Sequence, residues 1–150
     1  RTLRHFLVTN KPLLVGLAEP RMKFDKWGSF KWSSHGYSFV DGNFPFNDSD
    51  SLGVIKQDTV SLTSVASDFQ SVTLNCTFNN APISITFVYA FNLYIRRHDM
   101  WRNIVDISEN MNNIWILIGY FNTVLRPKEK TGQNFRRASA QDLSVCIEKC

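Results

Sequence analysis

Three polar side chains stand just after apolar segments of this sequence, and their types suit phosphate-ester chemistry. Glu19 follows the apolar run Leu13–Ala18, and Tyr89 ends a segment in which apolar and polar residues alternate. Asn122 stands after the run Trp115–Ile118 and a glycine turn. In α/β proteins, side chains that leave the carboxyl end of a strand project into an open crevice. An acid, a phenol and an amide at three strand ends therefore predict a hydrolase site for phosphate esters, at which the three side chains converge.

Each of these residues also has a plain structural interpretation. Glu19 could be an exposed acid at the start of a loop, because Pro20 ends the strand. Tyr89 could be a half-buried packing residue with a solvated hydroxyl, and Asn122 could hold an Asx turn. A carboxylate at a strand end is costly to bury without a cation or a donor, so burial of Glu19 would require a partner.

The elements that position these residues follow from the hydrophobic pattern. Leu13–Ala18 and 114–118 are continuous apolar runs, which are typical of buried strands covered on both faces. Alternating segments predict further strands at 37–40, 52–56, 59–66, 71–78 and 83–90, with a hairpin turn at 79–82. Helices are predicted over 1–10, 26–33 and 94–110, and after an N-cap at Ser139 in 139–142.

Length and composition indicate one globular domain of the α/β class. The 150 residues are 43% hydrophobic and 20% charged, which allows a real core and argues against disorder. Strands followed by a helix, a strand and a helix predict a layered α/β sandwich. No apolar run approaches the roughly 18 residues that a membrane span needs.

Four motifs in order resemble those of the endonuclease/exonuclease/phosphatase superfamily. They are Ala18-Glu19-Pro20, Phe87-Val88-Tyr89-Ala90, Arg96-Arg97 with Trp101, and Ile118-Gly119-Tyr120-Phe121-Asn122. Each motif alone is weak, but the four in this order and at these distances are quite specific. The resemblance is greatest to the endonuclease domain of plant LINE-type (non-LTR) retrotransposons, and it runs from about Leu3 to the C-terminus.

The resemblance implies a fold and a set of roles. The fold is a partial four-layer α/β sandwich, with residues 1–150 as a single incomplete domain. Glu19 would be the acidic ligand of a catalytic Mg²⁺ that neutralises and polarises the phosphate. The Tyr89 hydroxyl would contact the scissile phosphate, and Asn122 would help to orient the attacking water and the phosphate.

One departure from the family bears on activity. The family motif Gly-Asp-x-Asn reads Gly119-Tyr120-Phe121-Asn122 here, so Tyr120 replaces the Asp that orients and deprotonates the water. A phenol with a reference pKa of about 10 is protonated at neutral pH, and loss of a general base costs about 10²- to 10⁴-fold. The family's N-terminal Asn and its C-terminal Asp and His also lack counterparts. We therefore expect a truncated, inactive fragment with an uncovered apolar sheet face and poor solubility.

A basic segment follows the last strand end and predicts DNA as a partner. Its five cations, interrupted only by Glu129, are Arg126, Lys128, Lys130, Arg136 and Arg137. Cations beside a phosphate site could hold a nucleic-acid backbone, and the net charge of +4 suits that partner without requiring it. The alternative is a solvated loop that is basic by chance. Neither a membrane nor an obligate protein partner is indicated.

The remaining residues of chemical interest favour plain interpretations. Three cysteines and no secretory leader indicate a reduced intracellular protein, nuclear or cytoplasmic and not secreted. Cys146 and Cys150 would share a helix face, but no His or further Cys completes a zinc set. Trp101 is expected in the core, with Arg96 and Arg97 on the helix surface at the edge of the DNA face.

Three hypotheses about function remain open at this point. The chain could be an inactive fragment of a Mg²⁺-dependent retrotransposon endonuclease. It could be a catalytically dead nucleic-acid-binding module that keeps the basic segment. It could also be the product of a decayed element without a selected function. The motifs favour the first hypothesis as ancestry, and Tyr120 separates ancestry from activity.

Overall fold

The computed structural model describes residues 3–19, 32–40, 52–132 and 134–150. Within them the elements, with η for a short 3-10 helix, are α1 (Leu3–Asn10), β1 (Leu14–Ala18), η1 (Trp32–His35), β2 (Tyr37–Phe39), β3 (Leu52–Gln57), β4 (Leu62–Ser67), β5 (Ser71–Phe78), β6 (Ala81–Tyr89), η2 (Tyr94–Arg97), α3 (His98–Glu109), β7 (Ile114–Tyr120), η3 (Pro127–Glu129) and α4 (Arg137–Lys149). The helix predicted over 26–33 lies mostly outside the described residues. Among the described helices, none has both the length and the apolar character needed to cross a membrane.

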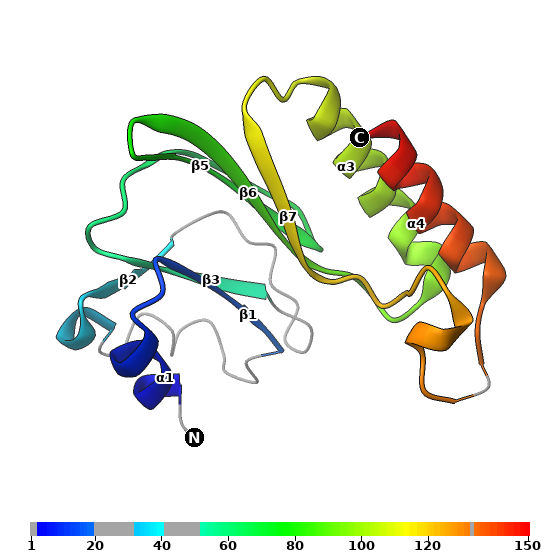
Figure 1. Ribbon diagram of the computed structural model, residues 1–150, viewed down its shortest axis with the longest axis horizontal. Coiled ribbons are helices and arrows are strands. Elements are labelled where there is room, and N and C mark those ends of the chain that lie inside the picture. Colours follow the sequence, from blue (N-terminus) through cyan, green and yellow to red (C-terminus); the bar gives the residue numbers. More distant parts are fainter. Residues whose placement is uncertain (1–2, 20–31, 41–51, 133) are drawn as a thin grey trace.

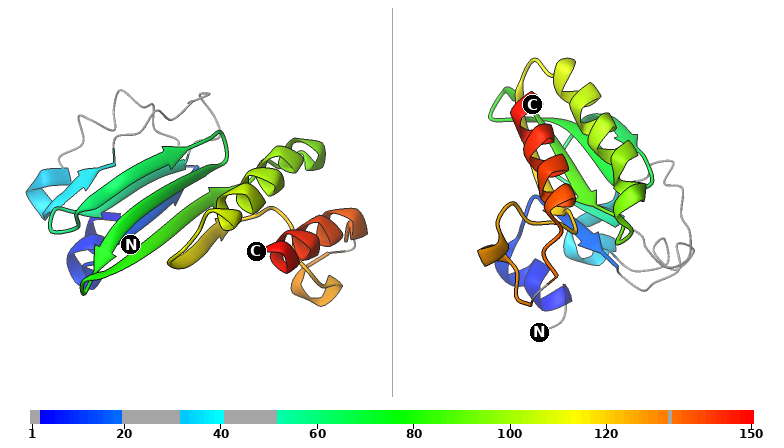
Figure 2. Two further views of the ribbon diagram at one scale, coloured as in Figure 1. Left: turned by 90° about the horizontal axis from the view of Figure 1, so that it is seen from above. Right: turned by 90° about the vertical axis from the view of Figure 1, so that its right-hand side faces the viewer.

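Two sheets pack face to face, and helices cover both outer faces (Figure 1). The first sheet is antiparallel, in the order β1-β3-β2. The second has the order β4-β5-β6-β7, and its β6–β7 pair is parallel. Helix α1 lies against the first sheet, while α3 and α4 lie side by side against the second (Figure 2). The predicted α/β class and layered sandwich are confirmed.

Three buried clusters separate the four layers. Leu7 of α1 packs with Ile55 of β3 between the helix and the first sheet. Val54, the neighbour of Ile55, packs with Phe87 of β6 between the two sheets. Ile104 of α3 packs against the second sheet on its other face. Because successive strand residues point to opposite faces, β3 supplies both of its flanking cores, and Val54 and Ile55 are each 0% exposed.

The turn between β5 and β6 is shorter than the predicted four residues. Asn79 and Asn80 form it, with φ angles of 49° and 64°. Asparagine tolerates this left-handed conformation, so two residues suffice to reverse the chain. Ala81 and Pro82, predicted in the turn, instead begin β6 and pair with β5.

The prediction that 114–118 is a buried strand is wrong. In β7 the side chains of Ile114, Ile116 and Ile118 are 62%, 44% and 52% exposed, whereas Trp115 and Leu117 pack toward the helices. The physical reason is that β7 is the last strand of its sheet, and the described part of the first sheet does not cover it. The other predicted buried strand, β1, is likewise an edge strand and is only half-buried.

The last helix begins earlier than predicted. Arg136 is its N-cap residue and makes no side-chain capping bond. Ser139, predicted as the cap, lies buried in the first turn of α4. Its hydroxyl accepts a hydrogen bond from Arg97 at 2.9 Å and donates one to Thr123 at 2.8 Å. Ser139 therefore ties α4 to neighbouring segments instead of capping it.

Gly119 is the position at which the parallel β6–β7 pair is most sensitive to a side chain. It has a φ of +153°, and a Cβ there would lie 2.0 Å from the carbonyl oxygen of Val88. Backbone atoms cannot move aside without breaking the pairing, so Gly119→Ala should cost about 3 kcal/mol or more. Native-state proteolysis should accelerate by more than about tenfold.

A second glycine gives the matched control for this substitution. Gly36 also has a positive φ, of +74°, but no heavy atom lies within 4 Å of its Cβ position. Gly36→Ala should therefore cost only the conformational strain of about 1 to 2 kcal/mol. Equal proteolysis rates for the two variants would contradict the close approach at Gly119.

Candidate active site

The carboxyl ends of β6 and β7 meet because the two strands are parallel. Tyr89 and Tyr120, the last residues of these strands, are register partners. The pairing continues one residue further, since the Ala90 amide donates to the Tyr120 carbonyl at 2.8 Å. Strand β1 brings Glu19 to the same place, as its contact with Tyr89 shows. Three segments far apart in sequence thus end at one edge of the molecule.

Glu19 and Tyr89 form a hydrogen-bonded pair at this edge. The Tyr89 hydroxyl donates to Oε1 of the carboxylate. Tyr89 itself is only 5% exposed, so its ring packs in the core while its hydroxyl faces an acid. Glu19 is exposed and has a φ of 47°, in the left-handed region. The pairing brings these two predicted site residues together, and their catalytic roles stay predictions.

Asn122 fixes the end of β7 to the end of β6. Its side-chain amide donates to the carbonyl of Ala90 at 2.5 Å, and its backbone has a φ of 52°. The Asn122 carbonyl accepts a hydrogen bond from Arg97. The amide therefore bridges two strand ends, and its predicted part in orienting water and phosphate remains a prediction.

Tyr120 stands beside Tyr89 where the family motif has a carboxylate. The two rings are stacked, with centroids 6.2 Å apart and planes inclined by 21°. Tyr120 is 58% exposed, whereas Tyr89 is 5% exposed. Among the described residues, the site presents the phenols of Tyr89 and Tyr120, the Glu19 carboxylate and the Asn122 amide. A phenol with the reference pKa of about 10 is a poor base at neutral pH.

The residues at this edge do not fit a resident Mg²⁺. Oxygen ligands suit that cation, and Glu19 supplies one carboxylate, which already accepts a hydrogen bond from Tyr89. No group of three or more acidic, histidine or cysteine side chains gathers anywhere in the described residues. A cation here would depend mainly on oxygens from a bound phosphate.

A cavity of about 650 Å³ opens beside the end of β7. Tyr120 and Asn122 line it, together with Lys130 and Arg136 of the predicted basic segment. The other three basic residues, Arg126, Lys128 and Arg137, lie exposed on the surface outside the cavity. The basic segment is therefore divided between a pocket and an open surface.

The interrupting acid of the basic segment has a structural use. The Glu129 carboxylate accepts hydrogen bonds from the amides of Leu125 and Arg126, at 3.1 and 3.2 Å. These bonds hold the short helix η3 inside the basic segment. Arg126 and Lys128 make no ion pair with a described residue, so their charges face solvent.

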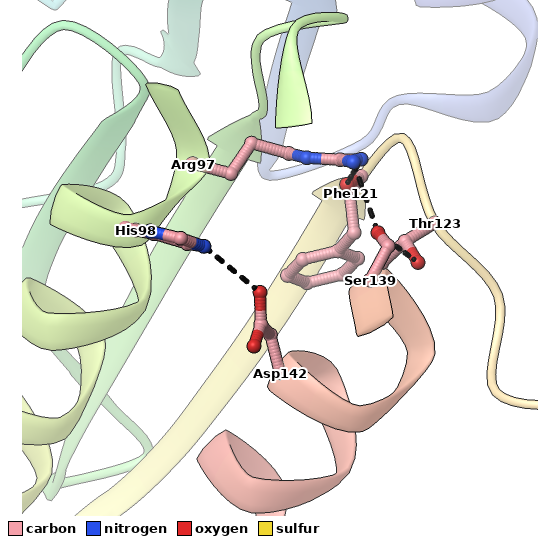
Figure 3. Close-up of polar contacts among 6 residues, drawn as sticks. All are labelled: Arg97, His98, Phe121, Thr123, Ser139 and Asp142. Carbon is pink, nitrogen blue, oxygen red and sulfur yellow. Dashed lines mark hydrogen bonds and ion pairs between the residues drawn. The ribbon is translucent and has the colours of Figure 1, made fainter. Parts of the chain in front are cut away.

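Arg97 is the functional residue that the sequence prediction placed wrongly. It was expected on the helix surface, but it is 3% exposed and reaches from η2 to the end of β7 and the start of α4 (Figure 3). Its guanidinium donates to the carbonyls of Phe121 and Asn122 and, at 2.9 Å, to Ser139. Trp101 is buried as predicted, at 6% exposure. The two lie four residues apart and so share one helical face, which is the signal that could have located Arg97.

The cysteines and His98 lie away from this edge. Cys76 and Cys146 are buried, Cys150 is exposed, and all three are free thiols. His98 lies 3.2 Å from Asp142 of α4, so these two side chains join the two helices of the outer layer (Figure 3). Neither residue lines the cavity beside β7.

Comparisons with solved structures identify the fold. No protein-family model and no curated protein matches this sequence. An AP endonuclease from Archaeoglobus fulgidus superposes with a TM-score of 0.75 at 12% identity, over 97% of this chain and 63% of that one. The D. rerio protein TDP2, complexed with single-strand DNA product, has a TM-score of 0.61 at 17% identity, over 81% and 52%.

A third similar structure is that of a phosphatase. ANGEL2, a 2′,3′-cyclic phosphatase, has a TM-score of 0.61 at 16% identity, over 81% of this chain and 43% of that one. The chain therefore spans between 42% and 63% of the length of these and similar structures. Identities this low establish the arrangement of the layers and nothing finer. The chain has the fold of the endonuclease/exonuclease/phosphatase enzymes, as part of their α/β sandwich.

Proposed function

We propose that this chain derives from the endonuclease of a LINE-type retrotransposon and that it binds DNA without cutting it. The observation that carries the proposal is the identity of Tyr120 at the end of β7, stacked beside Tyr89. In that place a nuclease of this kind needs a group that accepts a proton from water. A protonated phenol is a poor acceptor, so the reaction stops at binding.

The remaining site residues retain a capacity to bind phosphate oxygen. The Asn122 amide uses one N–H on Ala90 and keeps a second for a phosphate oxygen, and the Tyr89 hydroxyl would have to release Glu19 in order to donate to one. Glu19 would hold Mg²⁺ only weakly, because a single carboxylate needs further oxygens from a phosphate to complete the coordination. The proposal therefore assigns these residues to substrate contact rather than to turnover.

The fold neighbours support nucleic acid as the partner. They include an AP endonuclease and a protein complexed with single-strand DNA product. The exposed cations Arg126 and Lys128 beside the strand ends have the charge that a DNA backbone requires. The second candidate function is a catalytically dead module in which DNA binding is the role of the chain itself rather than a remnant of the endonuclease. A decayed product would bind no better than its net charge dictates.

DNA binding should be sensitive to salt and should depend on the exposed part of the basic segment. Replacing Arg126 and Lys128 with Gln removes two phosphate contacts, so the slope of log affinity against log salt for a duplex should fall by about 1.8. Fluorescence anisotropy with a labelled duplex at several salt concentrations measures the slope. The chain can be fused to a soluble carrier for this purpose.

A charge-matched pair provides the control for that experiment. Arg102 on α3 and Lys149 on α4 are exposed cations outside the proposed DNA face. Gln at both positions removes the same net charge and should leave the slope within about 0.3 of the parent value. Equal losses in the two double variants would mean that binding follows net charge alone, which would support the decayed-product hypothesis.

A further inference from the structure

The cavity beside the end of β7 is lined by cations without an opposing acid. Among the described residues around it, Arg97, Lys130 and Arg136 carry positive charge, and no Asp or Glu is present. The guanidinium carbons of Arg97 and Arg136 lie 5.9 and 5.3 Å from the centre of the same ring, that of Tyr94. Two like charges gathered at one ring repel each other unless an anion lies between them.

The burial of Arg97 and its Nε, unpaired within the described residues, are the strongest evidence that this cavity binds an anion. Its side chain is 3% exposed, and its Nε has no hydrogen-bond partner among the described residues. Burial, and then the neighbouring Arg136, lower the pKa of the Arg97 guanidinium, while the charge of Asp142, which does not line the cavity, raises it. A buried cation without a direct counter-ion is costly, and an anion entering the cavity would relieve that cost.

The start of α4 adds backbone donors to the same wall. Arg136 and Ser139 from this helix end line the cavity. The N-terminus of α4 has neither a side-chain cap nor an acidic residue in its first turn. The free amides and the helix dipole at such an end favour an anion. The helix end and the three cationic side chains therefore all favour a negatively charged ligand.

The geometry points to a phosphate-binding pocket for the terminal phosphate of a nucleic-acid strand, held by Arg97 and Arg136. Arginine pairs with phosphate through two parallel hydrogen bonds, and a terminal phosphate carries up to two negative charges. A volume of about 650 Å³ suits one nucleotide rather than a passing duplex. Tyr120 and Phe135 also line the cavity and offer faces on which a base can stack.

This inference rests on the proposed function only for the nature of the strand. Recognition of phosphate by the cavity does not need Glu19, Tyr89 or any cutting. The exposed cations Arg126 and Lys128 would contact the backbone of a bound strand, whereas the cavity would bind its terminal phosphate. The two contributions can therefore be separated by substitution.

The test compares short single strands that differ only in their ends. Fluorescence anisotropy of a labelled five-nucleotide DNA, with phosphate or hydroxyl at its 5′ or 3′ end, measures binding to the full chain. At least one terminal phosphate should tighten binding by about tenfold or more. Arg136→Gln should abolish that difference, and Lys128→Gln should weaken all the strands equally.

Inorganic phosphate separates the failure of the cavity from the failure of the proposed function. Millimolar phosphate should slow native-state proteolysis of the parent chain but not of Arg136→Gln, and sodium chloride of equal ionic strength should slow neither. If phosphate protects while no strand binds, the cavity stands and the DNA-binding proposal falls. If neither terminal nor inorganic phosphate distinguishes the parent from Arg136→Gln, the pocket is refuted. Arg136 is exposed, so its replacement tests the pocket without disturbing the core. Arg97→Ala would disturb the core, because Arg97 is buried.

Discussion

Supercoiled plasmid and abasic-site DNA should remain uncut when they are incubated with this chain and Mg²⁺. Tyr120 supplies no base at neutral pH, and loss of a general base alone lowers the rate by about 10²- to 10⁴-fold. Glu19 meets Tyr89 at the strand ends, and no group of three or more potential metal ligands gathers among the described residues, so the metal would be bound weakly as well. Gel electrophoresis of the plasmid, with an active nuclease as the positive control, should show nicking at the background rate.

Restoring the missing carboxylate should not restore cutting. Tyr120→Asp would add a second acid near Glu19, but no histidine or third acid is gathered there among the described residues. Groups that act as a unit in catalysis give little rate when only some are present. The result that would overturn this account is metal-dependent nicking by the unmodified chain that Glu19→Ala abolishes.

Such nicking would require another acid to activate the water. Asp41 and Asp142 are the two candidates that the sequence offers. Asp142 belongs to α4 and lies 3.2 Å from His98, outside the cavity at the strand ends. Asp41 lies outside the described residues. Substituting each by Asn in the nicking assay would identify the acid responsible.

Local patterns were enough to predict most elements and the meeting of Glu19 with Tyr89. Strand β5 has the predicted bounds, because its alternation and the asparagines after it are encoded within ten residues. The rule that parallel strands bring their carboxyl ends to one edge accounts for Tyr89 and Asn122 at the ends of β6 and β7, whereas Glu19 reaches Tyr89 from β1 of the other sheet. In both cases the information lies in the segment itself or in its order along the chain.

The exposure of one face of β7 and the burial of Arg97 could not be predicted in the same way. Both depend on neighbours that are distant in sequence. An apolar run such as 114–118 reads the same whether its strand is central or at an edge. Arg97 became buried because α4, which begins 40 residues later, closes over it with Ser139. The cavity and its cations arise from that contact, so they were visible only in three dimensions.

The isolated chain should be poorly soluble or partly folded, and the reason is the uncovered face of β7. Ile114, Ile116, Ile118 and Tyr120 project from one face of this edge strand, and each is 44% to 62% exposed. An apolar stripe beside unpaired strand edges promotes association between copies. Sedimentation of lysate fractions and light scattering of purified protein should show aggregates. A soluble monomer with one sharp thermal transition would show that the domain is complete without a cover for β7.

Substitutions on the two sides of the second sheet separate surface association from core failure. Ile116→Thr with Ile118→Thr reduces the exposed stripe while keeping β-branched residues, so soluble yield should rise by about threefold or more. Ile104→Thr is the matched control, because the same chemical change falls at a side chain that is 0% exposed on α3. It buries a hydroxyl in an apolar cluster and should cost about 2 to 3 kcal/mol, lowering the yield further. If the surface pair also lowers the yield, the stripe is packed in solution, and association of the chain must have another cause.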